Sequence, residues 1–84
     1  LATDRDVAEW ARVWSAAYRG LQMRLEYGVP TVIDAYGATN EAEFFAVATE
    51  TYFLQPEALS WEYPDLFDSI ARYYRPNGNR WYTN

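Results

Sequence analysis

The chain has 84 residues with a formal net charge of −5; half of the residues are hydrophobic and 19% are aromatic. This length limits the chain to one domain, this aromatic content excludes a disordered tail, and the negative charge argues against nucleic acid as a partner. The chain has no cysteine and no histidine, so it offers no disulfide, no thiolate metal ligand and no imidazole.

Two features of the sequence concern its context. No apolar run is long enough to cross a membrane, so no membrane partner is predicted, and we expect a cytoplasmic location. The first residue is Leu1 rather than methionine, which leads us to expect that these residues are a piece of a longer chain.

The first predicted element is an amphipathic helix that begins after Thr3 or Asp4 and ends at Gly28, with Pro30 preventing its return. Its apolar residues recur at helical spacing and form a single stripe. They are Val7, Trp10, Ala11, Trp14, Ala17, Tyr18, Leu21 and Leu25. We expect this stripe to face the core.

A short segment rich in β-branched residues, 31–36, follows this helix and is predicted to be extended. It has no partner strand in the sequence, so it is expected to form a connector rather than part of a sheet. Gly37 then allows a turn.

A second helix is predicted from Thr39 or Asn40 to about Leu54, where Pro56 stops it. Apolar residues lie on both of its faces, which is typical of a helix that is buried on all sides. Glu43 and Glu50 lie nearly in line among these apolar residues. Buried carboxylates are costly unless they are paired, hydrogen-bonded or bound to metal.

A short helical turn is predicted from Pro56 through Trp61, and a last helix from about Pro64 to Tyr74. The residues 76–79 have the composition of a turn. The sequence therefore predicts an all-α fold of about three to four helices with one extended connector, in a single helical domain over residues 1–84.

Glu43 has two interpretations on these grounds. It stands three residues after the expected cap Asn40, the spacing of a capping box in which cap and glutamate each bond the other's amide. It is also a carboxylate suited to chemistry, in a dyad with Glu50 about 10.5 Å further along the helix axis. The many aromatic residues are explained by core packing better than by a sugar-stacking surface, because most fall on the helix stripes.

Two strings of the sequence resemble a known family. "VIDAYGATNEAEFFAVATETYF" (32–53) and "EYPDLFDSIARYYR" (62–75) are similar to the C-terminal part of the zinc metallopeptidases of the Mlc titration factor A family. Ala35 departs from the proline that is usual in the family. The central string also resembles the corresponding segment of the anthrax lethal factor protease domain, and the resemblance covers nearly the whole chain.

The resemblance implies roles for particular residues. In the family, zinc is held by two histidines of an HExxH helix and by a glutamate that corresponds to Glu43. The tyrosine that corresponds to Tyr36 lies by the metal and is thought to stabilise the oxyanion formed in peptide hydrolysis. Glu50 also matches a family glutamate, and Glu50 and Asn40 are the residues expected to support the metal ligand. Such a site agrees with the three protein ligands that catalytic zinc requires.

This sequence departs from the family because it contains neither HExxH nor any histidine. We therefore expect an inactive C-terminal fragment of a zinc-dependent peptidase domain, with no zinc bound to this chain alone. The alternatives are a non-catalytic helical interaction module, with a partner such as a transcriptional repressor, and a helical domain whose function the sequence does not reveal. If the HExxH half is absent, the second helix lacks cover on one face, and a homodimer is expected.

Overall fold

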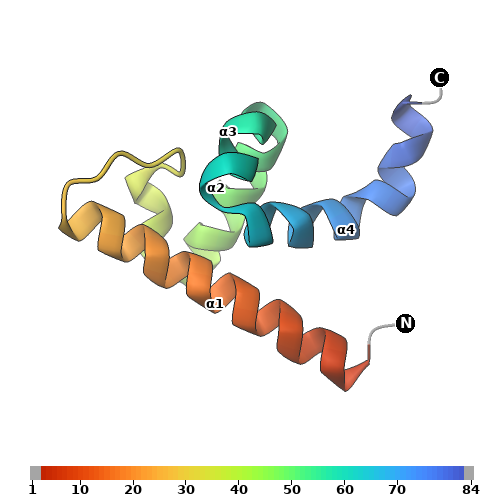
Figure 1. The fold of residues 1–84 in the computed structure, drawn as a ribbon, viewed down its shortest axis with the longest axis horizontal. Helices are drawn as coiled ribbons and strands as arrows, with labels where there is room; N and C mark the ends of the chain where they lie inside the picture. Colours follow the sequence, from red (N-terminus) through yellow and green to blue (C-terminus); the bar gives the residue numbers. More distant parts are fainter. Residues whose placement is uncertain (1–2, 83–84) are drawn as a thin grey trace.

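The computed structural model of the chain describes the backbone of residues 3–82 and the side chains of residues 3–74. The described part is all-α, as the sequence predicts, and contains no strand. Its elements are α1 (Asp4–Glu26), the 3-10 helix η1 (Ala35–Ala38), α2 (Glu41–Leu54), α3 (Pro56–Glu62) and α4 (Pro64–Tyr82) (Figure 1). None of the helices in this described part is long and apolar enough to cross a membrane.

The ends of α1 lie where the sequence predicts them. Thr3 and Asp6 form a capping box, in which each side chain accepts a hydrogen bond from the backbone amide of the other residue. At the other end, Gly28 has a φ of 70°, a left-handed conformation that glycine adopts without steric cost. These local interactions fix the length of α1.

The connector differs from the prediction in its second half. Residues 31–34 are irregular, but Ala35–Ala38 form a 3-10 helix instead of an extended end followed by a turn. The cause is Asp34, whose carboxylate accepts a hydrogen bond from the amide of Tyr36 and caps this short helix. A local side-chain hydrogen bond therefore outweighs the β propensity of the segment.

The last helix is longer than predicted. It continues to Tyr82, so the turn expected at residues 76–79 is wrong. Proline inside a helix removes one amide donor and bends the helix but does not have to end it. Figure 1 shows that α4 changes direction in its C-terminal part.

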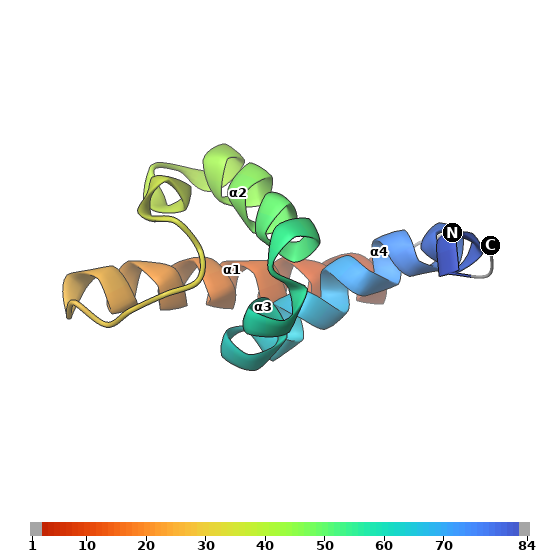
Figure 2. The same ribbon diagram turned by 90° about the horizontal axis from the view of Figure 1, so that it is seen from above.

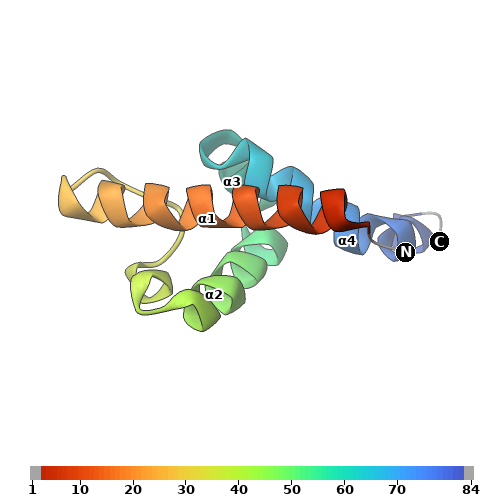
Figure 3. The same cartoon turned by 90° about the horizontal axis from the view of Figure 1, so that it is seen from below.

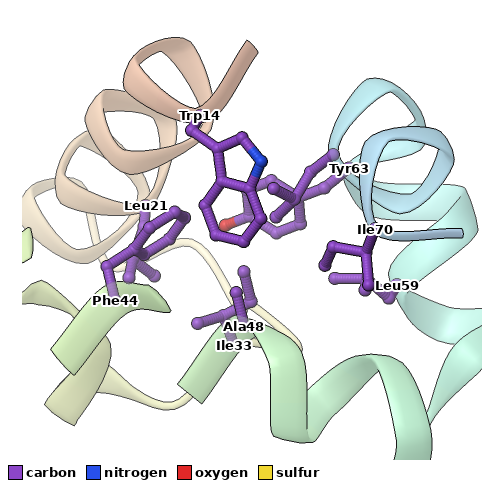
Figure 4. Packing of buried hydrophobic residues seen from close by; sticks show 9 residues of the cluster. Trp14, Leu21, Ile33, Phe44, Ala48, Leu59, Tyr63 and Ile70 are labelled. Atoms are coloured by element: carbon purple, nitrogen blue, oxygen red, sulfur yellow. The ribbon is translucent and has the colours of Figure 1, made fainter. Parts of the chain in front are cut away.

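The helices surround α1. Seen from above and from below, α2 lies on one side of α1, and α3 with the start of α4 lies on the other (Figures 2 and 3). The molecule measures 41 × 32 × 20 Å. The core lies where these helices meet, and Trp14 points from α1 into it (Figure 4). The buried cluster comprises Trp14, Leu21, Ile33, Phe44, Ala48, Leu59, Tyr63, Leu66 and Ile70.

Polar contacts attach the connector and α4 to this core. The indole nitrogen Nε1 of Trp14 donates a hydrogen bond to Ser69 Oγ at 3.1 Å, which joins α1 to α4. The Tyr63 hydroxyl lies 2.9 Å from the hydroxyl of Thr31. The carboxylate of Glu62 accepts a hydrogen bond from the amide of Val32 at 2.9 Å. The connector is thus held against the junction of α3 and α4.

Two predicted apolar surfaces are less buried than the sequence indicates. The ends of the α1 stripe are exposed, at Val7, Trp10 and Leu25. On α2, the outward face is also exposed, so the prediction that α2 is buried on all sides is wrong. This outward face consists of Ala42, Ala46, Glu50, Phe53 and Leu54, with Glu43 half-buried at its start.

Candidate functional site

The turn from η1 into α2 brings together the two residues to which the resemblance gives catalytic roles. The hydroxyl of Tyr36 donates a hydrogen bond to Glu43 Oε2 at 3.3 Å. The two residues are seven positions apart, and they meet because η1 turns the chain back along the first turn of α2. Tyr36 and Glu43 therefore lie side by side at the start of α2.

The capping interaction of Asn40 is only half of the predicted box. Asn40 Oδ1 accepts a hydrogen bond from the amide of Glu43 at 2.9 Å, so Asn40 is the N-cap of α2. No reciprocal bond from the Asn40 amide to the Glu43 carboxylate is found among the described side chains; the carboxylate meets Tyr36 instead. Glu43 is therefore capped through its backbone, and its side chain is left for other contacts.

The backbone beneath Tyr36 is tightly packed. Ile33 is fully buried just before η1, and Gly37 is buried inside it. A Cβ at Gly37 would lie 3.2 Å from Ile33 Cγ2 and 3.4 Å from Val47 Cβ, so a larger residue there would require Ile33 or η1 to shift. Tyr36 itself is 58% exposed, and its ring lies on the surface above this packed base.

Glu50 is not brought into this site by any hydrogen bond or ion pair found among the described side chains. It is exposed on the outward face of α2, seven residues and about two turns beyond Glu43, on the same side of the helix. The costly burial expected for Glu50 is therefore wrong, because the apolar residues around it are exposed too. The proposed carboxylate dyad has no contact to support it.

The donor set of the site does not suffice for zinc by itself. Within the part of the chain whose side chains the structure describes, no group of three or more histidine, cysteine, aspartate or glutamate residues could hold a metal ion. Glu43 provides one carboxylate, whereas a catalytic zinc needs three protein ligands. These residues therefore do not form a zinc site on their own.

Shifted pKa values occur at Tyr63 and in the first turns of α1. Burial raises the pKa of the Tyr63 phenol above its usual value. At the start of α1, the amide of Thr3 lowers the pKa of Asp6, and the hydrogen bond from Arg12 lowers the pKa of Glu9. These groups stabilise the scaffold and do not mark a second reactive centre.

Sequence reasoning missed two features of the structure, one beneath Tyr36 and one on another part of the surface. Asp34 holds the amide of Tyr36 at 2.8 Å, and its position two residues before Tyr36 is a recognisable signal for such a turn. The second feature is a hollow of about 230 Å³ between α1, α2 and α4. Its lining includes Trp10, Trp14, Phe45, Tyr73 and Tyr74, so several aromatic residues assigned to the core are partly exposed.

Comparisons with known proteins agree with the sequence motifs. An uncharacterized protein of Synechocystis sp. is 40% identical over 74 residues, which is 88% of this chain and 27% of that protein. Mlc titration factor A of Serratia proteamaculans is 36% identical over 73 residues, 84% of this chain and 28% of that protein. The homologue of the same name from Salmonella schwarzengrund is 37% identical over 73 residues, again 84% of this chain and 28% of that protein.

The extent of these matches defines what they establish. The chain spans little more than a quarter of the length of these relatives. No solved structure matches the chain significantly. A family model described as glucose-regulated metallo-peptidase M90 matches residues 1–75, which is most of the sequence. The chain therefore belongs to the glucose-regulated metallo-peptidase M90 family.

Proposed function

We propose that this chain is one part of a zinc-dependent peptidase domain, the C-terminal part, and is inactive alone. It supplies Glu43 as a zinc ligand and Tyr36 as a hydrogen-bond donor. The observation that carries the proposal is the contact between the Tyr36 hydroxyl and Glu43 Oε2 at the surface, 3.3 Å apart. Membership of a metallopeptidase family supports the same chemistry.

The chemistry of the two side chains suits these roles. A glutamate carboxylate binds zinc well and has two oxygens, so Glu43 can accept from Tyr36 with one and bind metal with the other. The phenolic hydroxyl of Tyr36 is a hydrogen-bond donor and can stabilise negative charge as it develops on a carbonyl oxygen. The remaining zinc ligands would come from an HExxH segment, which these 84 residues do not contain.

The test joins this chain to an HExxH segment of the family and follows hydrolysis of a peptide substrate. We expect turnover with the unaltered sequence, a loss of turnover for Glu43→Ala, and a lowered kcat for Tyr36→Phe. Glu50→Ala is the matched control on the same helix face and should retain activity. Turnover that persists in Glu43→Ala contradicts the assignment of the ligand.

A second candidate function, a helical interaction module, is favoured by the exposed apolar residues on α2. Phe53 and Leu54 are exposed on the outward face of α2, and Phe45 is exposed beside it. A second copy of the chain or a protein partner such as a transcriptional repressor would cover them, in the cytoplasmic location expected from the sequence. Partner capture that survives Glu43→Ala but is lost in Phe53→Glu supports this function over the first.

A further inference from the structure

We infer that Asp34 is a positioning residue that holds the Tyr36 hydroxyl at the Glu43 carboxylate; its functional meaning rests on the function proposed above for that pair. Asp34 precedes η1, and among the described residues no hydrogen bond joins its carboxylate to the Tyr36 hydroxyl or to the Glu43 carboxylate. It acts through the backbone that carries Tyr36.

The carboxylate and the carbonyl of Asp34 both hold the first turn of η1. Asp34 Oδ1 accepts a hydrogen bond from the amide of Tyr36 at 2.8 Å, and the Asp34 carbonyl accepts one from the amide of Gly37 at 2.9 Å. The first of these bonds depends on the side chain. An amide in the first turn of a helix has no acceptor within the helix. In the described part of the chain, the Tyr36 amide donates to the Asp34 carboxylate instead.

Other contacts fix the backbone on either side of Tyr36, but they do not fix the Tyr36 ring. Ile33 is fully buried, and Gly37 packs against Ile33 and Val47. The Tyr36 carbonyl accepts from the amide of Thr39 at 3.1 Å, which leads the chain directly into the cap of α2. Tyr36 is 58% exposed, so core packing contributes little to the direction of its side chain.

The direction of the Tyr36 ring therefore depends on the backbone angles at Tyr36 and on the hydroxyl bond to Glu43. Rotamer preferences follow the backbone conformation, and a helix start without its cap loses that conformation most readily. Removal of the Asp34 carboxylate frees the Tyr36 amide. The hydroxyl then has no fixed position relative to Glu43, and the pair is no longer preorganised.

Asp6 provides a matched comparison. Its carboxylate also accepts a hydrogen bond from a backbone amide at a helix start, that of Thr3 at 3.1 Å, and it is also exposed. If Asp34 only stabilised a helix end, its loss would resemble the loss of Asp6. A positioning role predicts an effect at Tyr36 that Asp6 does not share.

The experiment is NMR spectroscopy of this 84-residue chain with labelled tyrosine and glutamate. The unaltered chain should show a nuclear Overhauser effect between the Tyr36 ring protons and the Glu43 side chain, with one dominant Tyr36 χ1 rotamer. We expect Asp34→Ala to lose the effect and to average χ1. Asp34→Asn should restore both, because its amide oxygen accepts the same bond, and Asp6→Ala should leave both unchanged.

Persistence of the Tyr36–Glu43 effect and of the single rotamer in Asp34→Ala overturns the inference. If Asp34→Ala does not fold, Asp34→Glu decides, because it keeps the charge but moves the carboxylate away from the amide; an unchanged Tyr36 signal there also overturns the inference.

Activity separates this inference from the proposed function. In a chain completed with an HExxH segment, Asp34→Ala should lower kcat with little change in KM, and should have no further effect once Tyr36 is phenylalanine. If turnover is indifferent to Tyr36→Phe and Glu43→Ala, the proposed function fails while the NMR result stands. If Asp34→Ala lowers kcat equally with and without the Tyr36 hydroxyl, the positioning role is overturned while the proposed function stands.

Discussion

At the residue scale, Glu43 serves two purposes through separate atoms. Its backbone amide donates a hydrogen bond to the side chain of the N-cap Asn40, and its carboxylate accepts one from the Tyr36 hydroxyl. The capping spacing in the sequence and the metal-ligand role implied by the family are therefore compatible, because the first uses the backbone and the second uses the side chain. Asn40→Ala is expected to weaken the start of α2 without removing a metal ligand.

A prediction at this scale concerns Tyr63. Its phenol has a pKa raised by burial above the usual 10.0, so the folded state holds the proton more tightly than the unfolded state does. The stability this provides is present below pH 10 and is lost as the pH rises from there through the folded-state pKa. The free energy of unfolding should fall over that range when measured by urea denaturation.

Tyr63→Phe is the control for that prediction. It removes the hydroxyl that lies 2.9 Å from Thr31 Oγ1, at a cost of about 1 kcal/mol at neutral pH. The difference between the variant and the unaltered chain should shrink above pH 10, because phenylalanine has no proton to lose. A difference that stays constant with pH contradicts the assignment to Tyr63.

At the element scale, the site depends on how closely η1 packs on α2. Gly37 is buried at their contact, and the space for a side chain there is taken by Ile33 and Val47. The position of Tyr36 over the start of α2 follows from this close approach. The packing of an element thus determines the position of a surface residue.

The corresponding prediction compares two glycines. Gly37→Ala would place Cβ 3.2 Å from Ile33 Cγ2, and overpacking of this kind costs about 1–3 kcal/mol. Gly20→Ala lies inside α1, where Cβ would be 3.9 Å from Tyr63, an ordinary contact, so the helix should gain about 0.5–1 kcal/mol. Thermal unfolding should therefore show a lower Tm for Gly37→Ala and a higher Tm for Gly20→Ala. An equal change in Tm for the two variants would contradict the prediction, because it would mean that η1 moves away from α2 without cost.

At the scale of the whole molecule, the outward face of α2 is apolar and lacks cover in the described part of the chain. Glu43 and Glu50 lie on the same face as Phe53 and Leu54. The proposed metal ligand is therefore at the border of a surface suited to contact with another protein segment. This face would be covered in either proposed function: by the rest of the peptidase domain in the first, and by the partner protein in the second.

A homodimer is the prediction that belongs to this scale. Complete burial of a large apolar side chain contributes about 1.5–3 kcal/mol. Burial of Phe53 and Leu54, which are 45% and 71% exposed, against a second copy would contribute part of this for each. We expect light scattering to find a dimer at micromolar concentration, and Phe53→Glu to convert it to a monomer. Val29→Glu, an equally exposed apolar position away from α2, is the control and should leave the dimer intact; a monomeric unaltered chain contradicts the prediction.

Local signals in the sequence predict the helices well, and burial less well. Thr3, Asn40, Pro56 and Pro64 define helix starts because capping and proline effects depend on a few neighbouring residues. The exposure of the outward face of α2 could not be predicted in this way. An apolar pattern shows that a face can be buried, whereas the arrangement of the other helices decides whether it is.

The candidate site was predictable to a similar degree. The motif singles out Tyr36 and Glu43 through a family resemblance, and the structure brings these two side chains into contact. The β-branched residues of segment 31–36 predict an extended conformation, and this pattern gives no signal for the 3-10 helix that Asp34 caps. Glu50 was placed in an apolar interior that the fold does not provide for it.

Zinc binding by the chain joined to an HExxH segment tests the central claim most directly. Competition with a chelator gives the zinc affinity of the unaltered protein and of the matched variants Glu43→Gln and Glu50→Gln. Loss of a supporting partner alone lowers metal affinity by about 10–100-fold, so we predict a loss of at least that size for Glu43→Gln and no change for Glu50→Gln. An affinity in Glu43→Gln equal to that of the unaltered protein would contradict the account.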